Sequence, residues 1–152
     1  MPLEHIHPMV VHFPIALAFL ALAFDLWWFV RRSAAASPLI QLRTGTVVLT
    51  LGALAAIVAY MFGDMAYDIA IAHGAPRDPL EMHEHWGKAT LAVYVVAALI
   101  RLFFWWRQSD DKPAAIAVAI GLSALITVMV VVTAYFGGHL VYDLGISVTP
   151  PH

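Results

Sequence analysis

The chain has 152 residues, of which 62% are hydrophobic and 12% are charged, and its formal net charge is −2. Typical soluble proteins contain about 45–50% apolar and about 25% charged residues, so this composition excludes an ordinary soluble domain. The chain has no cysteine, which excludes disulfides, thiolate metal sites, iron–sulfur clusters and covalent c-type haem attachment. Any metal must therefore be held by histidine, methionine or carboxylate side chains.

Four apolar stretches approach or exceed the ~20 residues that a helix needs to span a bilayer. They lie near residues 8–30, 44–63, 79–106 and 114–136. Little chain remains outside them, so we predict an all-α integral membrane protein. Residues 1–152 are expected to form a single domain, an up-down bundle of four transmembrane helices. The first stretch is too long for a signal-peptide core and lacks a basic leader, so we expect it to be retained. No internal repeat is evident.

The first predicted helix opens beside histidines and closes in aromatic residues. Pro8 suits a first helical turn, which places His12 about one turn inside the helix. An imidazole at that depth is costly unless something binds it. Two tryptophans and two arginines end the helix, as is typical of a membrane interface. Asp25, about a turn and a half before the arginines, is interpreted as an interfacial partner of Arg43 or Arg101.

The second and third predicted helices bring further polar groups to the same depth. The second contains small residues that let membrane helices approach closely, and it ends at Asp64. The segment 78–81 reads as a capping box, so the third helix begins before its apolar part. His83 and His85 fall on nearly opposite faces of that helix, given ~100° per residue. Gly87 lies one turn deeper than His83 and leaves room for a flat ligand beneath the imidazole.

The basic residues predict how the bundle is oriented. Six of the eight flank the first and third connections: Arg31, Arg32, Arg43, Arg101, Arg107 and Lys112. The positive-inside rule places these connections in the cytoplasm and both termini on the periplasmic side of a prokaryotic inner membrane. All eight histidines then lie on the periplasmic side. Four of them precede, link or follow the helices and are expected to be solvated and unimportant: His5, His7, His73 and His152.

Motifs along the chain also have a familiar arrangement. The chain opens with His7-Pro-Met-Val-Val-His-Phe-Pro-Ile-Ala-Leu17, ends its second helix in Asp64, starts its third with His83-x-x-x-Gly87 and closes with Gly137-Gly-x-Leu-Val-Tyr142. Together these motifs resemble the domain-of-unknown-function 2231 family of small four-helix prokaryotic membrane proteins. The resemblance implies the fold over nearly the whole chain and no established activity. It points to His12, Asp64, His83 and the closing motif with Tyr142.

The first functional hypothesis is a haem site. In an up-down bundle the first and third helices lie diagonally and start on the same side, so His12 and His83 are predicted to face each other. Two facing neutral imidazoles are what a low-spin haem b requires as axial ligands. The expected cofactor site is His12, His83, Gly87 and Tyr142. The protein would then be an electron carrier, or a subunit of a larger redox complex, at the periplasmic face rather than a stand-alone enzyme.

Two alternatives remain open at this point. The side chains of His12, His83, His85, His139 and Asp64 form a nitrogen and oxygen set that suits zinc or copper. Alternatively, the protein is a cofactor-free scaffold subunit in which His12 only hydrogen-bonds Asp64. No phosphate loop, nucleophile triad or nucleic-acid patch is recognisable. The expected partners are therefore the lipid bilayer and redox-complex subunits, and not nucleic acid.

Overall fold

A computed structural model of the chain describes residues 5–31 and 38–146, except for the side chains of residues 38–42. All regular structure in these residues is helical. The helices are α1 Ile6–Val10, α2 His12–Arg31, α3 Pro38–Ala72, α4 Arg77–Trp106 and α5 Pro113–Tyr142. Because α1 and α2 together form one segment, the described part of the chain has four helical segments long and apolar enough to cross a membrane. The predicted all-α four-helix membrane bundle is confirmed.

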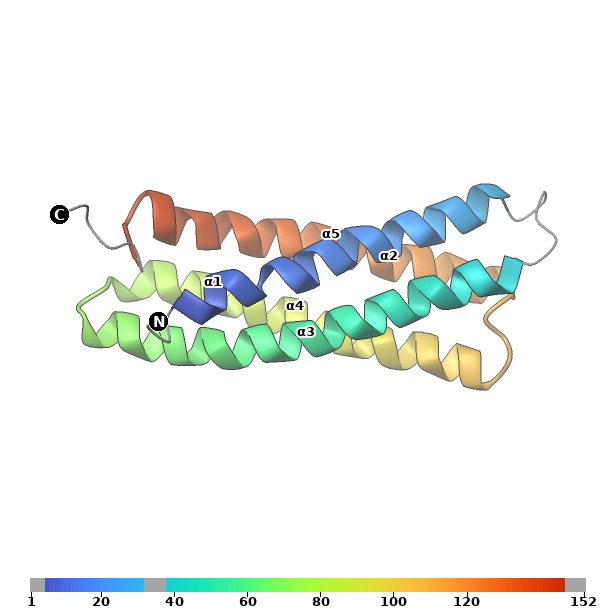
Figure 1. Cartoon of the computed structure of the whole chain (residues 1–152), viewed down its shortest axis with the longest axis horizontal. Coiled ribbons are helices and arrows are strands. Elements are labelled where there is room, and N and C mark those ends of the chain that lie inside the picture. The colour runs from blue at the N-terminus through green and yellow to red at the C-terminus, as the bar shows by residue number, and fades with distance from the viewer. Residues whose placement is uncertain (1–4, 32–37, 147–152) are drawn as a thin grey trace.

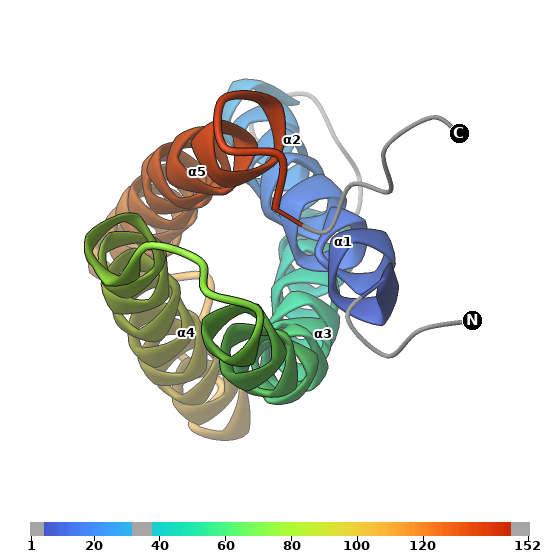
Figure 2. The ribbon, with the colours of Figure 1, turned by 90° about the vertical axis from the view of Figure 1, so that its left-hand side faces the viewer.

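The helices run alternately up and down along one long axis (Figure 1). Seen down that axis, α2 packs on α3, α3 on α4, α4 on α5, and α5 on α2 (Figure 2). The first and third membrane segments are therefore diagonal, as predicted. We call the end that carries α1, the α3–α4 connection and the last turn of α5 the histidine end. The opposite end, at Arg31 and the α4–α5 connection, is the arginine end.

A break at Val11 separates α1 from α2, and Pro14 explains it. Proline has no N–H to donate to the carbonyl four residues earlier, here that of Val10, and its ring clashes with that carbonyl. α1 therefore ends at Val10 and packs on α3 instead of continuing along the line of α2 (Figure 2). The first predicted membrane helix, near 8–30, corresponds to the segment Ile6–Arg31, and the break within it was not predicted.

Two helices extend past their predicted ends. α3 continues to Ala72 rather than ending near 63, and α5 continues through its glycine pair to Tyr142 rather than ending near 136. The extra turns pack on one another, with Ala70, Leu80 and Leu140 forming a buried apolar cluster at the histidine end. Burial of this cluster offsets the cost of about 1 kcal/mol for each glycine in a helix.

The α3–α4 connection is consequently short. It comprises residues 73–76, where a connection over 65–79 was expected. α4 begins at Arg77 with Pro76 in the N-cap position, and no side chain caps it by a hydrogen bond. The predicted capping box does not form, because Asp78 and Glu81 already lie inside the first turns of the helix.

The core between the two ends is built from small residues. Ala18, Ala21, Ala53, Ala97 and Ala98 pack around Leu49, Tyr94 and Ile126. Small side chains let membrane helices approach closely, as the sequence predicts for the second helix. Large apolar side chains such as Phe13, Leu99 and Val128 remain exposed on the outside of the bundle. In a membrane protein these side chains face lipid.

One ion pair is buried toward the arginine end. Asp25 of α2 contacts Arg101 of α4 at 2.7 Å, and both side chains are almost fully enclosed. Asp25 was expected to pair with Arg43 or Arg101, and Arg101 is confirmed as its partner. Arg43 instead binds Asp110, at 2.9 Å, in the α4–α5 connection.

Candidate functional site

Two imidazoles face each other inside the histidine end. His7 comes from α1 and His83 from α4, with ring centroids 6.1 Å apart and ring planes at 77°. His7 Nδ1 lies 2.9 Å from the carbonyl oxygen of Ala59 on α3. His83 Nδ1 lies 3.1 Å from the carbonyl oxygen of Thr133 on α5. Because a carbonyl oxygen only accepts, each Nδ1 must carry the hydrogen that is donated.

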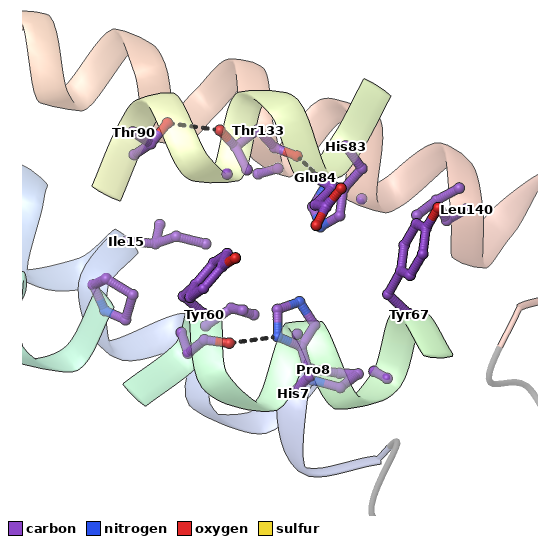
Figure 3. Close-up of a pocket in the computed structure, with 18 of the residues that line it drawn as sticks. His7, Pro8, Ile15, Tyr60, Tyr67, His83, Glu84, Thr90, Thr133 and Leu140 are labelled. Atoms are coloured by element: carbon purple, nitrogen blue, oxygen red, sulfur yellow. Dashed lines mark hydrogen bonds between the residues drawn. The ribbon is translucent and has the colours of Figure 1, made fainter. Parts of the chain in front are cut away.

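This hydrogen bonding fixes what the other ring nitrogen can do. A neutral imidazole with hydrogen on Nδ1 has its lone pair on Nε2. Histidines that bind metals have this arrangement, in which the second N–H is donated to a backbone carbonyl or carboxylate. Figure 3 shows the two rings pointing toward each other across a cavity, with their hydrogen-bonded nitrogens turned away. His7 and His83 therefore turn two Nε2 atoms with free lone pairs toward the same cavity.

Each imidazole is seated against a glycine. A Cβ on Gly63 of α3 would lie 2.9 Å from His7 Cε1, and a Cβ on Gly137 of α5 would lie 2.9 Å from His83 Cε1. Each glycine is four residues, about one turn, after the carbonyl that accepts from the same ring. The seat of each histidine thus consists of one glycine and one carbonyl on a neighbouring helix.

The two seats correspond by position as well as by contact. His83 lies 76 positions after His7, and Arg101 lies 76 positions after Asp25. Gly137 lies 74 positions after Gly63. The dipeptide Phe-Gly and a following Tyr-Asp occur in both halves, at 62–63 with 67–68 and at 136–137 with 142–143. The first two membrane segments therefore correspond to the last two. This weak internal repeat was missed because few of the equivalent residues are identical.

The imidazoles share a cavity of about 450 Å³ at the histidine end. All five helices contribute to its wall, which is mostly apolar and includes Ala56, Leu91 and Val130. Figure 3 shows Ile15 and Tyr60 on one side of the imidazoles and Tyr67 on the other. Among its few polar groups, the hydroxyls of Thr90 and Thr133 lie 2.9 Å apart. Glu84 also lines the cavity and binds Lys88 at 2.6 Å.

All four predicted cofactor residues contact this cavity, but His12 does not face His83 as expected. His83, Gly87 and Tyr142 line the cavity, and a Cβ on Gly87 would meet nothing within 4 Å, so the space beneath His83 is open as expected. His12 touches the cavity but is largely exposed, and its Nδ1 lies 3.4 Å from the carbonyl of Met9. The residue opposite His83 is His7, which was expected to be solvated.

The register of the first membrane segment explains this error. The buried positions of α2 are Pro14, Ala18, Ala21, Asp25 and Trp28, which repeat at spacings of four and three. His7 lies seven positions before Pro14 and continues this stripe toward the N-terminus, whereas His12 is off it. The stripe is visible in the sequence. It was overlooked because His12 was chosen by its depth below Pro8 and not by its face.

The five residues predicted to bind zinc or copper do not come together. His12, Asp64 and His83 contact the cavity, but His85 and His139 are exposed and lie outside its wall. His139 Nδ1 instead lies 2.6 Å from a carboxylate oxygen of Asp143. Within residues 5–31 and 38–146, no three histidine or acidic side chains form a group that could hold a metal ion. The predicted five-ligand site is therefore not present.

Comparison with known proteins identifies the chain at family level. Residues 4–150 match a family described as predicted membrane protein (DUF2231). The chain belongs to the DUF2231 family. The resemblance inferred from the opening and closing motifs is thus confirmed, and the chain is a multi-pass membrane protein. Neither the curated proteins nor the solved structures gave a match. A function for this DUF2231 protein has to be argued from the two facing histidines.

Proposed function

We propose that the protein binds one haem b between His7 and His83 and carries electrons at the histidine end of the bundle. The observation that carries the proposal is the facing pair of imidazoles with outward-turned Nδ1 atoms. The ring centroids of His7 and His83 lie 6.1 Å apart, and these two side chains would hold the haem iron through their Nε2 atoms.

The angle between the rings is also compatible with the proposal. The ring planes lie at 77°, and either ring would still offer its Nε2 atom to an iron held between them. The carbonyls of Ala59 and Thr133 fix the two rings in their orientations by accepting from Nδ1. Such second contacts orient metal-ligating histidines and raise their basicity.

The shape and polarity of the cavity support a flat, largely apolar occupant. Its volume of about 450 Å³ lies within the roughly 300–1,000 Å³ of small-molecule and cofactor sites. The apolar wall around Leu91 and Val130 suits the hydrophobic part of a macrocycle.

The ligand set favours electron transfer over catalysis. Haem supplies one-electron chemistry, and its potential depends on axial ligands and burial. His7 and His83 would hold the haem together, and a haem held by two protein side chains would supply electron transfer. The protein is therefore an electron carrier, or the cytochrome subunit of a larger redox complex, and not a stand-alone enzyme.

The distribution of basic residues supports an orientation of the protein in the membrane. Arg31, Arg43, Arg107 and Lys112 lie at the arginine end, while Arg77 and Lys88 lie at the histidine end. By the positive-inside rule the arginine end is cytoplasmic, and the histidine end faces the periplasm of a prokaryotic inner membrane. Electrons would then be exchanged at the periplasmic face.

Reduced-minus-oxidised spectra of the purified protein test the proposal. We expect a b-type α band in the wild type and its loss, or conversion to a high-spin spectrum, in His7→Ala and His83→Ala. The matched controls are His12→Ala and His85→Ala, which remove exposed imidazoles close to the same site. Zinc or copper in place of haem in the wild type would overturn the haem assignment. A wild type without any cofactor would favour a scaffold.

A further inference from the structure

Tyr94 connects the helix that carries His83 to the break below His7. Its side chain is fully buried, and its hydroxyl donates a 2.8 Å hydrogen bond to the carbonyl oxygen of Pro14. Tyr94 lies about three turns below His83 on the same face of α4. Pro14 causes the break between α1 and α2. One hydrogen bond therefore joins the two segments from which the facing imidazoles come.

The Tyr94 ring has a fixed place between the helices. A Cβ on Gly52 of α3 would lie 2.7 Å from the Tyr94 hydroxyl oxygen and 2.8 Å from Cε1, so the ring fills space that glycine leaves. A buried hydroxyl without a hydrogen bond costs free energy, and the carbonyl of Pro14 is its acceptor. The Tyr94 ring packs against Gly52 and its hydroxyl bonds the carbonyl of Pro14, so the ring sets the distance between α4 and the break at Val11.

We infer that Tyr94 is a positioning residue for the cofactor site. Its hydroxyl holds the carbonyl of Pro14 and thereby sets the direction of α1, which keeps His7 opposite His83. α1 has only five residues and is joined to the start of α2 through Val11, whose N–H bonds the carbonyl of His7. The inference rests on the proposed haem site for one of its readouts, but the direction of α1 can be measured without a cofactor.

The cofactor-independent test uses spin labels. The chain has no cysteine, so Met9→Cys on α1 and Met82→Cys on α4 give two unique label sites, and both methionines are exposed, at 55% and 46%. We expect a narrow distance distribution in this background and a broader or shifted one when Tyr94→Phe removes the hydroxyl. Thr50→Val is the matched control, because the Thr50 hydroxyl also bonds a carbonyl, that of Thr46, but within α3.

The second readout is the spectrum of the ferric haem. Tyr94→Phe should retain the haem content of the wild type and shift the low-spin g-values, which depend on the mutual orientation of the two imidazoles, whereas Thr50→Val should not. Gly52→Ala should have the same effect as Tyr94→Phe, because the added Cβ displaces the phenol ring of Tyr94. If Tyr94→Phe does not fold, Gly52→Ala is measured in its place.

The two proposals can fail separately. The inference is wrong if Tyr94→Phe and Gly52→Ala leave both the label distance and the g-values at wild-type values. If the label distance changes in a protein that contains no haem, Tyr94 still positions α1 and the proposed function is what fails.

Discussion

Arg101 and Asp25 form a two-pronged ion pair inside the bundle, in which Nη1 and Nη2 each lie 2.7 Å from one carboxylate oxygen. Ser123 donates to the same carboxylate at 2.6 Å, and Thr46 accepts from Arg101 Nε at 3.2 Å. Gly45 permits this approach, since a Cβ there would lie 2.5 Å from Asp25 Oδ1. Buried charges are tolerated in membrane helices when they are paired and hydrogen-bonded. The four polar side chains thus form one satisfied unit.

Breaking this pair should destabilise the bundle strongly. Asp25→Ala leaves Arg101 buried without a counter-charge, a change that typically costs about 3–5 kcal/mol. We expect a large fall in the thermal unfolding midpoint of the purified protein in detergent. The exchanged pair Asp25→Arg with Arg101→Asp should recover part of the loss, because it restores opposite charges.

The matched control for this experiment is the other ion pair of the arginine end. Arg43→Ala breaks the contact with Asp110, and loss of the Arg43 side chain, which is 29% exposed, opens the Asp110 side chain, 9% exposed in the intact protein, to water. Its effect should be much smaller. Equal midpoints for Asp25→Ala and Arg43→Ala would mean that the buried pair adds nothing special to stability.

Filling the glycine seats should displace the imidazoles. In Gly63→Ala and Gly137→Ala the new methyl group would lie 2.9 Å from the Cε1 atom of His7 or His83, closer than carbon atoms pack. We expect each variant to bind several-fold less haem per protein than the wild type. Gly138→Ala is the control, since the nearest atom to its Cβ lies 3.9 Å away. Similar haem content in all three variants would contradict the assignment of these seats.

Straightening the first membrane segment should separate stability from cofactor binding. In Pro14→Ala the residue at position 14 regains an N–H that can bond the carbonyl of Val10, and the proline clash disappears, which in a helix interior is worth about 3 kcal/mol or more. α1 would then continue the line of α2 and carry His7 away from Ala59. We expect an equal or higher unfolding midpoint with less bound haem. A less stable variant that keeps its haem would show that the break does not place His7.

The proposed orientation can be read by labelling in intact cells. A single cysteine at position 73, in the α3–α4 connection, should react with a membrane-impermeant maleimide, and one at position 111, in the α4–α5 connection, should not. Both His73 and Asp111 are exposed, so neither is shielded by the protein itself. The reverse pattern would place the facing histidines on the cytoplasmic side.

Much of the fold could be predicted from the sequence because a bilayer leaves a hydrophobic chain few alternatives. Runs of about 20 apolar residues must become helices whose backbone groups bond internally. The helix ends at the histidine end could not be placed in this way. There α3 runs on to Ala72 because Ala70 meets Leu80 and Leu140, residues distant in sequence, and apolar length alone does not encode such contacts.

Of the two facing histidines, His83 was predicted from the sequence and His7 was not. His83 was identified from its face on the third membrane segment, where Gly87, Thr90 and Tyr94 mark the inner side. His12 was identified from its depth alone, and depth does not determine direction around a helix. Applying the same facial argument to the stripe through Pro14 and Asp25 would have selected His7.

The correspondence between the two halves has a consequence for which half can pack against which. At the histidine end the equivalent residues are identical, His7 and His83, and their imidazoles face each other in one cavity. Toward the arginine end the equivalent residues are opposite in charge, Asp25 and Arg101. If one half paired with a second copy of itself, two aspartates or two arginines would meet in the apolar interior, and like charges there repel strongly. The two halves are alike where each places an imidazole in the shared cavity and opposite in charge where they pack, so a first half pairs with a second half in preference to another first half.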